Sequence, residues 1–191
     1  MQNIWVTGFF GILLLMLKKI FLDSKEFHFT KSELPILIHG EEHVGSSLFT
    51  ISVLADLYSQ GSKICALTGY PMARDEFDNQ TGSGENAQFF TKENEELFIT
   101  SIQTNSDMKD HIVVVKNIEL FSEEIFDTVK DFTNLIISGD INKCSFKEKI
   151  LQKSFNTKIY FSQLYDLLPE LQKYEGYVIT PNISGIVSLE V

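Results

Sequence analysis

Residues 38–49, with the sequence IHGEEHVGSSLF, have the spacing of a loop that binds phosphate. Such loops follow the pattern G-x-x-x-x-G-K-[ST]: backbone N–H groups surround the phosphates, the lysine neutralises them, and the hydroxyl holds Mg²⁺. Gly40 and Gly45 stand at the glycine positions and Ser47 at the hydroxyl position, but Ser46 replaces the lysine. The loop keeps the residues that shape it and lacks the cation.

The interior of this loop is acidic. Its four residues are Glu41, Glu42, His43 and Val44. A carboxylate about 4 Å from a phosphate charge costs roughly 1 kcal/mol in water and about 4 kcal/mol at an effective dielectric constant of 20. Both glutamates therefore oppose the ligand that the loop spacing would otherwise suit.

The elements around the loop alternate as a parallel sheet with crossover helices requires. The uninterrupted runs PILI, IVVV and LIIS favour strands that are buried on both faces, and residues 78–88 have the composition of a mobile polar loop. The pattern predicts strands over 34–40, 62–69, 97–103, 111–117, 134–140, 157–162, 176–181 and 185–190, and helices over 47–60, 72–77, 122–132, 145–155 and 164–172. The expected fold is α/β and ends in a β-hairpin.

Three segments, 34–67, 111–129 and 134–140, together resemble the core of a RecA-like P-loop NTPase domain in spacing and local pattern. The resemblance covers roughly residues 34–162 and rests on the order of strand, glycine loop and apolar helix. It implies a three-layer domain with a mostly parallel central sheet, which we expect over residues 24–191.

The same resemblance implies that the chemistry is missing. Family members carry acids after the hydrophobic strand of the second motif, where this chain has Lys116 and Asn117, and often a glutamate after the second strand, where it has Gly69 and Tyr70. We expect Lys116 to end the strand beside the loop and to face Glu41 or Glu42. The alternative is that these charges are solvated surface residues. The degenerate nucleotide site is predicted to contain no catalytic residue and no metal, and to comprise Gly40, Glu41, Glu42, His43, Val44, Gly45, Ser46, Ser47, Lys116 and Asn117.

The N-terminus is apolar from Ile4 to Leu17, and Lys18 and Lys19 follow. This composition predicts a helix over residues 1–23 that a partner covers on the side the sheet leaves open. A membrane anchor formed by residues 4–22 is the alternative, since fourteen apolar residues are fewer than the roughly 20 that a spanning helix needs.

Composition bounds the partners. A formal net charge of −10 disfavours unaided binding to nucleic acid, and two cysteines without C-x-x-C spacing favour a reduced, cytoplasmic setting. We therefore expect a RecA-like subunit that is no enzyme, takes no cofactor (ATP being disfavoured) and joins an assembly with a RecA-like protein or with copies of itself. Two alternatives remain: an ATP hydrolase that uses Lys116 or a partner's lysine, and a membrane-tethered adaptor.

Overall fold

The structure is a computed structural model that describes residues 19–41, 45–82, 84–161, 171 and 174–189. One ten-stranded sheet runs through these residues in the order β2-β1-β10-β9-β8-β3-β7-β6-β4-β5. Its strands are β1 (Ile20–Leu22), β2 (Lys25–Phe27), β3 (Ile36–His39), β4 (Lys63–Thr68), β5 (Ala87–Thr91), β6 (His111–Lys116), β7 (Leu135–Gly139), β8 (Thr157–Tyr160), β9 (Glu175–Ile179) and β10 (Ser184–Leu189).

The sheet has a parallel and an antiparallel part. Strands β8, β3, β7, β6, β4 and β5 are parallel, and β9, β10, β1 and β2 continue the sheet in antiparallel pairing. The carboxyl ends of the parallel strands meet at one edge, which is where sheets of this kind place their ligands.

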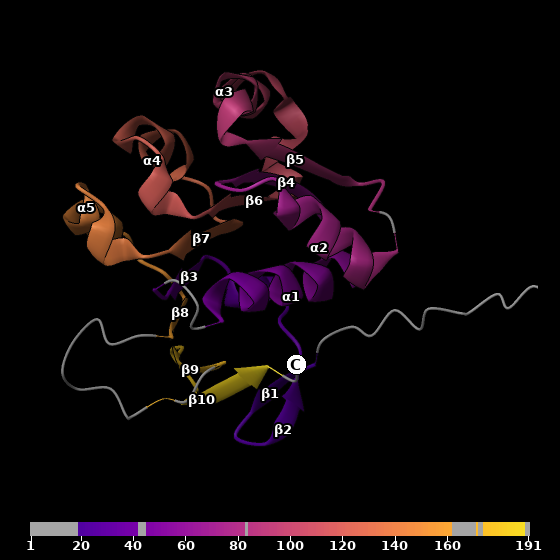
Figure 1. Cartoon of the computed structure of the whole chain (residues 1–191), viewed down its shortest axis with the longest axis vertical. Coiled ribbons are helices and arrows are strands. Elements are labelled where there is room, and N and C mark those ends of the chain that lie inside the picture. Colours follow the sequence, from indigo (N-terminus) through magenta and orange to yellow (C-terminus); the bar gives the residue numbers. More distant parts are fainter. Residues whose placement is uncertain (1–18, 42–44, 83, 162–170, 172–173, 190–191) are drawn as a thin grey trace, which may run out of the picture.

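Helices cover both faces of the parallel part, and Figure 1 shows α1 and α2 on one side and α3, α4 and α5 on the other. The helices are α1 (Ser46–Ser59), α2 (Met72–Thr81), α3 (Glu95–Thr104), α4 (Glu123–Val129) and α5 (Lys147–Gln152). Alternate strand residues enter opposite layers: Ile36 and Ile38 pack in the layer of α1, whereas Leu37 packs with α3, α4 and α5. The predicted three-layer α/β fold is confirmed.

The segment predicted as a strand over 97–103 is a helix, α3. Phe98 and Ile102, four residues apart, are buried against the sheet, while Leu97 is exposed. This spacing follows one face of a helix, although the aromatic and β-branched residues of the segment favour a strand.

The edge strand β5 replaces the end of the predicted polar loop. Helix α2 also continues beyond its predicted end to Thr81, and Gly82 then terminates it in a left-handed conformation, with its N–H donating to the carbonyl of Asp78 at 2.8 Å. The helix predicted over 164–172 lies outside the described residues except for Leu171.

The predicted N-terminal helix over residues 1–23 is wrong at its carboxyl end, where Ile20–Leu22 form β1. Ile20 is buried in the α1 layer with Leu22 packed against it, and β1 pairs with β10 and β2. Residues 1–18 lie outside the described residues. Within the described part of the chain, no helix has the length and apolar character needed to cross a membrane.

Candidate functional site

The loop from β3 to α1 lies at the carboxyl edge of the sheet, and its glycines are sterically required. A Cβ at Gly40 would lie 2.6 Å from Cβ of Ser46. Gly45 has φ +104° and precedes α1, whose first hydrogen bond runs from the N–H of Phe49 to the carbonyl of Gly45 at 3.0 Å. The two glycines, Ser46 and Ser47 therefore meet as the sequence predicts, whereas Glu42, His43 and Val44 lie outside the described residues.

Ser46, at the position of the missing lysine, is 7% exposed. Its backbone carbonyl accepts a hydrogen bond from Oγ1 of Thr50 at 2.8 Å, which fixes the first turn of α1. Its short side chain carries no charge, so this position cannot neutralise a phosphate.

Lys116 is buried, with 3% exposure, at the end of β6. Strand β7 separates β6 from β3, so the expectation that Lys116 ends the strand beside the loop is wrong. Its Nζ donates to Oδ1 of Asn117 at 3.3 Å, and no salt bridge joins it to a carboxylate within the described ranges. Burial lowers the pKa of the ammonium group, and the charges of Glu76 and Glu119 act in the opposite direction.

Glu76 and Glu119 are site residues that the sequence analysis missed. Glu76 comes from α2, and Glu119 comes from the short helix η4 (Ile118–Leu120) that follows β6. Oε2 of Glu119 accepts a hydrogen bond from the N–H of Asp140 at 3.0 Å and packs against Gly139. Among the described carboxylates, these two glutamates are the ones whose charge acts on Lys116, and Glu41 of the loop is not among them.

Two tyrosines complete the site. The ring of Tyr174 lies against Gly45, and Tyr70 follows β4 with 48% of its surface exposed. The loop, the strand ends and the two tyrosines line a pocket of about 460 Å³. Its described lining residues are Gly40, Glu41, Gly45, Ser46, Ser47, Leu48, Tyr70, Glu76, Lys116, Asn117, Glu119, Ser138, Gly139 and Tyr174. Its described lining carries three carboxylates and one ammonium group.

A buried histidine links the end of β3, just before the loop, to the segment after β7. Nδ1 of His39, at the end of β3, accepts a hydrogen bond from the N–H of Ile141 at 3.1 Å. Burial lowers the pKa of this imidazole, against the smaller opposing effect of Asp140. The neutral ring therefore ties β3 to the segment after β7.

The comparisons with known proteins identify the fold. No family model matches the chain, and no curated protein has significant sequence similarity to it. ATPases 2 and 3 of EssC from Geobacillus thermodenitrificans superpose with a TM-score of 0.59 at 11% identity, over 91% of this chain and 40% of that one. The fold is that of the P-loop ATPase domains.

Two further solved structures agree with this assignment. The pCW3 conjugation coupling protein TcpA, in its monomer form with ATPγS, gives a TM-score of 0.50 at 16% identity over 81% of this chain and 59% of that one. The flagellar accessory protein FlaH from Methanocaldococcus jannaschii gives 0.50 at 13% identity, over 82% and 88% of the two chains. The chain thus spans 40% and 59% of the first two proteins. At these identities the likeness establishes the P-loop fold.

Proposed function

We propose that the chain is a non-catalytic P-loop domain that serves as a structural or binding subunit of a larger protein assembly. The observation that carries this proposal is the residue at the lysine position of the loop, the buried and uncharged Ser46. Without a cation there, the loop offers backbone N–H groups and the hydroxyl of Ser47 to a phosphate, and no neutralising charge.

The electrostatics of the pocket support the same reading. Glu41, Glu76 and Glu119 outnumber Lys116 around it, so a triphosphate would add negative charge to a site that is already acidic. Each carboxylate near a phosphate costs on the order of 1 kcal/mol or more, depending on solvent exposure. Lys116 occupies the strand end where active relatives of this fold are expected to hold the metal through an acid, which disfavours Mg²⁺.

The surface beside the pocket suits a protein partner. Tyr70 and Met72 follow the carboxyl end of β4, and Leu97 lies in the first turn of α3, just after β5. These three large apolar side chains are exposed, with Met72 at 66%, and Tyr70 also lines the pocket. An exposed apolar side chain at the rim of a pocket, as Tyr70 is, offers surface to a protein partner.

Calorimetry with Mg-ATP and a turnover assay test the proposal. We expect no phosphate release and no affinity tighter than about 1 mM, which corresponds to about −4 kcal/mol. Light scattering of the purified chain, alone and with its captured partner, tests the assembly role. A micromolar affinity that depends on magnesium would overturn the non-catalytic reading.

The alternative is a divergent ATP-binding hydrolase. Lys116 lines the same pocket as Ser47 and supplies the one ammonium group of its described lining, and the similar structure of TcpA is one with ATPγS. If the alternative is correct, wild-type protein binds Mg-ATP and the Lys116→Met variant loses most of that affinity. A lysine supplied by a partner would instead give binding only in the reconstituted assembly.

A further inference from the structure

The antiparallel part of the sheet has one face that the described helices leave uncovered. The core layer of α3, α4 and α5 contains strand residues from β3, β4, β6 and β7, and none of the described residues of β1, β9 and β10 belongs to it. On their other side, β1, β9 and β10 place Ile20, Val178 and Val187 in the layer of α1. The side of these three strands that points away from α1 is therefore without a covering layer.

The side chains on this uncovered side are apolar and contiguous. Successive strand residues point to opposite faces, so the residues next to those of the α1 layer point away from it. Four of them, which we call the open face, are Phe21, Tyr177, Ile179 and Ile186. Tyr177 and Ile186 are direct cross-strand partners, and Phe21 pairs with Ser188, two residues from Ile186.

The exposure of the open face is unusual for a sheet with one side in water. Ile179 is 39% and Ile186 is 36% exposed, whereas Phe21 and Tyr177 are half-buried. Antiparallel sheets that leave one face in water normally place polar residues there. A contiguous group of large apolar side chains indicates instead that a further segment or molecule covers the face.

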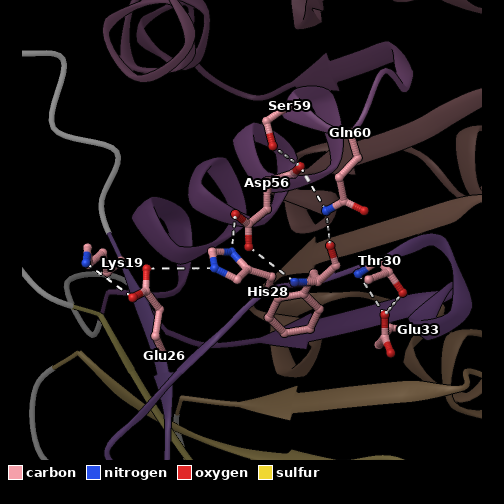
Figure 2. Close-up of polar contacts among 9 residues, drawn as sticks. Lys19, Glu26, His28, Thr30, Glu33, Asp56, Ser59 and Gln60 are labelled. Atoms are coloured by element: carbon pink, nitrogen blue, oxygen red, sulfur yellow. Dashed lines mark hydrogen bonds and ion pairs between the residues drawn. The ribbon is translucent and has the colours of Figure 1, made fainter.

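The chain supplies an apolar segment beside this face. Residues 4–17, with the sequence IWVTGFFGILLLML, lie outside the described residues and end four positions before Phe21. The described chain begins at Lys19, whose Nζ lies 3.2 Å from Oε2 of Glu26 (Figure 2), and Glu26 is the cross-strand partner of Phe21. The segment is therefore joined to the sheet at the edge of the open face.

The length of the segment is sufficient to cover the face. Strands β1, β10 and β9 are together about 15 Å wide, because neighbouring strands lie about 4.8 Å apart. The fourteen residues from 4 to 17 reach about 21 Å even at the short rise of a helix. Reach therefore does not limit the contact.

We propose that residues 4–17 cover the open face of their own chain and bury Ile179 and Ile186. The contact removes apolar surface from water on both sides. Because the segment is joined covalently to β1, its effective concentration at the face is on the order of millimolar, which favours it over a second copy of the chain. The proposed function does not use this face, so the two proposals stand or fall separately.

Photo-cross-linking in the intact protein tests the position of the segment. p-Benzoylphenylalanine in place of Phe10 keeps an apolar aromatic ring, and a mixture of light and isotope-labelled chains separates cross-links within one chain from those between copies. We expect cross-links within one chain to peptides of residues 175–189. The same reagent in place of Leu97, on α3, is the control and should not reach these peptides.

Two other cross-linking results would overturn the proposal. Cross-links between light and labelled chains would assign the open face to a second copy. Cross-links from position 10 only to other parts of the same chain, or none at all, would show that the segment does not lie on the face.

Thiol reactivity measures how fully the face is covered. Cys65 and Cys144 are buried, and burial raises the pKa of both thiols to about 12, so a thiol introduced at the surface dominates the reaction with a maleimide. We expect Ile186→Cys to react about tenfold more slowly than Leu97→Cys, whose position is 59% exposed, because the segment must first open. Equal rates would show that the face is uncovered and would contradict the proposal.

A charge placed in the segment should expose the face again. Leu13→Asp, added to Ile186→Cys, should raise the rate about tenfold, because an ionised carboxylate disfavours burial against apolar side chains. Asn3→Asp, which adds the same charge outside residues 4–17, is the matched control and should leave the rate unchanged. Leu97→Cys combined with Leu13→Asp should react as Leu97→Cys does, which shows that the domain stays folded. If Ile186→Cys stays slow in the presence of Leu13→Asp, another occupant covers the face and the proposal is wrong.

Discussion

The ring of Tyr174 lies against the backbone of Gly45, so that a Cβ atom at position 45 would stand 2.6 Å from Cδ1 of the tyrosine. Both residues have positive φ, +104° for Gly45 and 69° for Tyr174. The start of α1 is therefore held by a contact with the segment just before β9, 129 positions further along the chain.

Replacing Gly45 by alanine should destabilise the domain through two separable effects. The left-handed backbone costs an L-residue about 1–2 kcal/mol, and the contact with Tyr174 should add on the order of 1 kcal/mol. Gly61→Ala is the matched control, because Gly61 has φ +83° and nothing within 4 Å of the added Cβ. Denaturant unfolding of both variants checks this, and equal losses would show that the ring moves aside freely.

Lys116→Met should stabilise the domain at pH 7. Burial lowers the pKa of Lys116 below 10.5, so keeping its ammonium group charged destabilises the folded protein. A hydrophobic side chain at this position removes that destabilisation, on the order of 1 kcal/mol. As the pH rises through the lowered pKa towards 10.5, folded wild-type protein releases the proton before the unfolded chain does, and its stability rises relative to the variant. The advantage of methionine should therefore shrink with pH.

Unfolding curves of wild type and Lys116→Met between pH 7 and 10 measure this difference. Burial raises the pKa of both thiols, Cys65 and Cys144, from 9.0 to about 12, which lowers stability above pH 9, but this contribution is common to both proteins and cancels. Lys63→Met, at an exposed lysine of the adjacent strand β4, is the control. A loss of stability in Lys116→Met at pH 7 would mean that the attraction of Glu76 and Glu119 outweighs burial.

The double variant Ser46→Lys with Lys116→Asp should gain affinity for Mg-ATP over either single variant. It places a cation in the loop and an acid at the strand end, the two charges that phosphate and Mg²⁺ require. Thermal shift with and without Mg-ATP is the measurement, and Ser46→Met with Lys116→Asp controls for side-chain length. If the double variant shows no nucleotide-dependent shift, Glu41, Glu76 and Glu119 are the groups that exclude nucleotide.

His39→Asn should reduce the loss of stability in acid. The pKa of His39 is lowered from 6.5, so below pH 6.5 the unfolded chain binds a proton that the folded protein excludes, and wild-type stability falls by up to about 1.4 kcal/mol per pH unit. The oxygen of asparagine can accept the N–H of Ile141 without titrating. Unfolding free energies at pH 7.5 and pH 5 test this, and an unchanged acid loss in the variant would place the effect on other groups.

The parts of the fold that could be predicted are those with a local signal. Runs such as IVVV form strands because β-branched residues suit a sheet buried on both faces, and the glycines of the loop stand where a side chain would collide. Helix α3 was predicted as a strand because Phe98, Ile99, Thr100 and Ile102 are aromatic or β-branched residues, which favour strands. Strand β1 is stabilised by pairing with β10, which lies far along the chain. The local sequence of β1 does not indicate that pairing.

The candidate site shows the same division. Gly40, Gly45 and Ser46 are near one another in the chain, and their meeting was predicted. Glu76 is 40 positions from Lys116 and comes close to it only because β4 and β6 are paired in the sheet. Lys116 therefore faces carboxylates that depend on sheet order, which the sequence alone does not determine.

Helix α1 is buried along most of its length and is also fastened to the segment before η1 (Lys31–Glu33). Asp56 accepts the N–H of Phe29 and bonds to His28, and Gln60 donates to the carbonyl of Phe29 (Figure 2). We expect the amide protons of the buried central turns of α1, residues 49–55, to be among the slowest to exchange with deuterium. If so, the side of the pocket formed by Ser46, Ser47 and Leu48 belongs to a helix that opens slowly, and this wall should change little when a ligand binds.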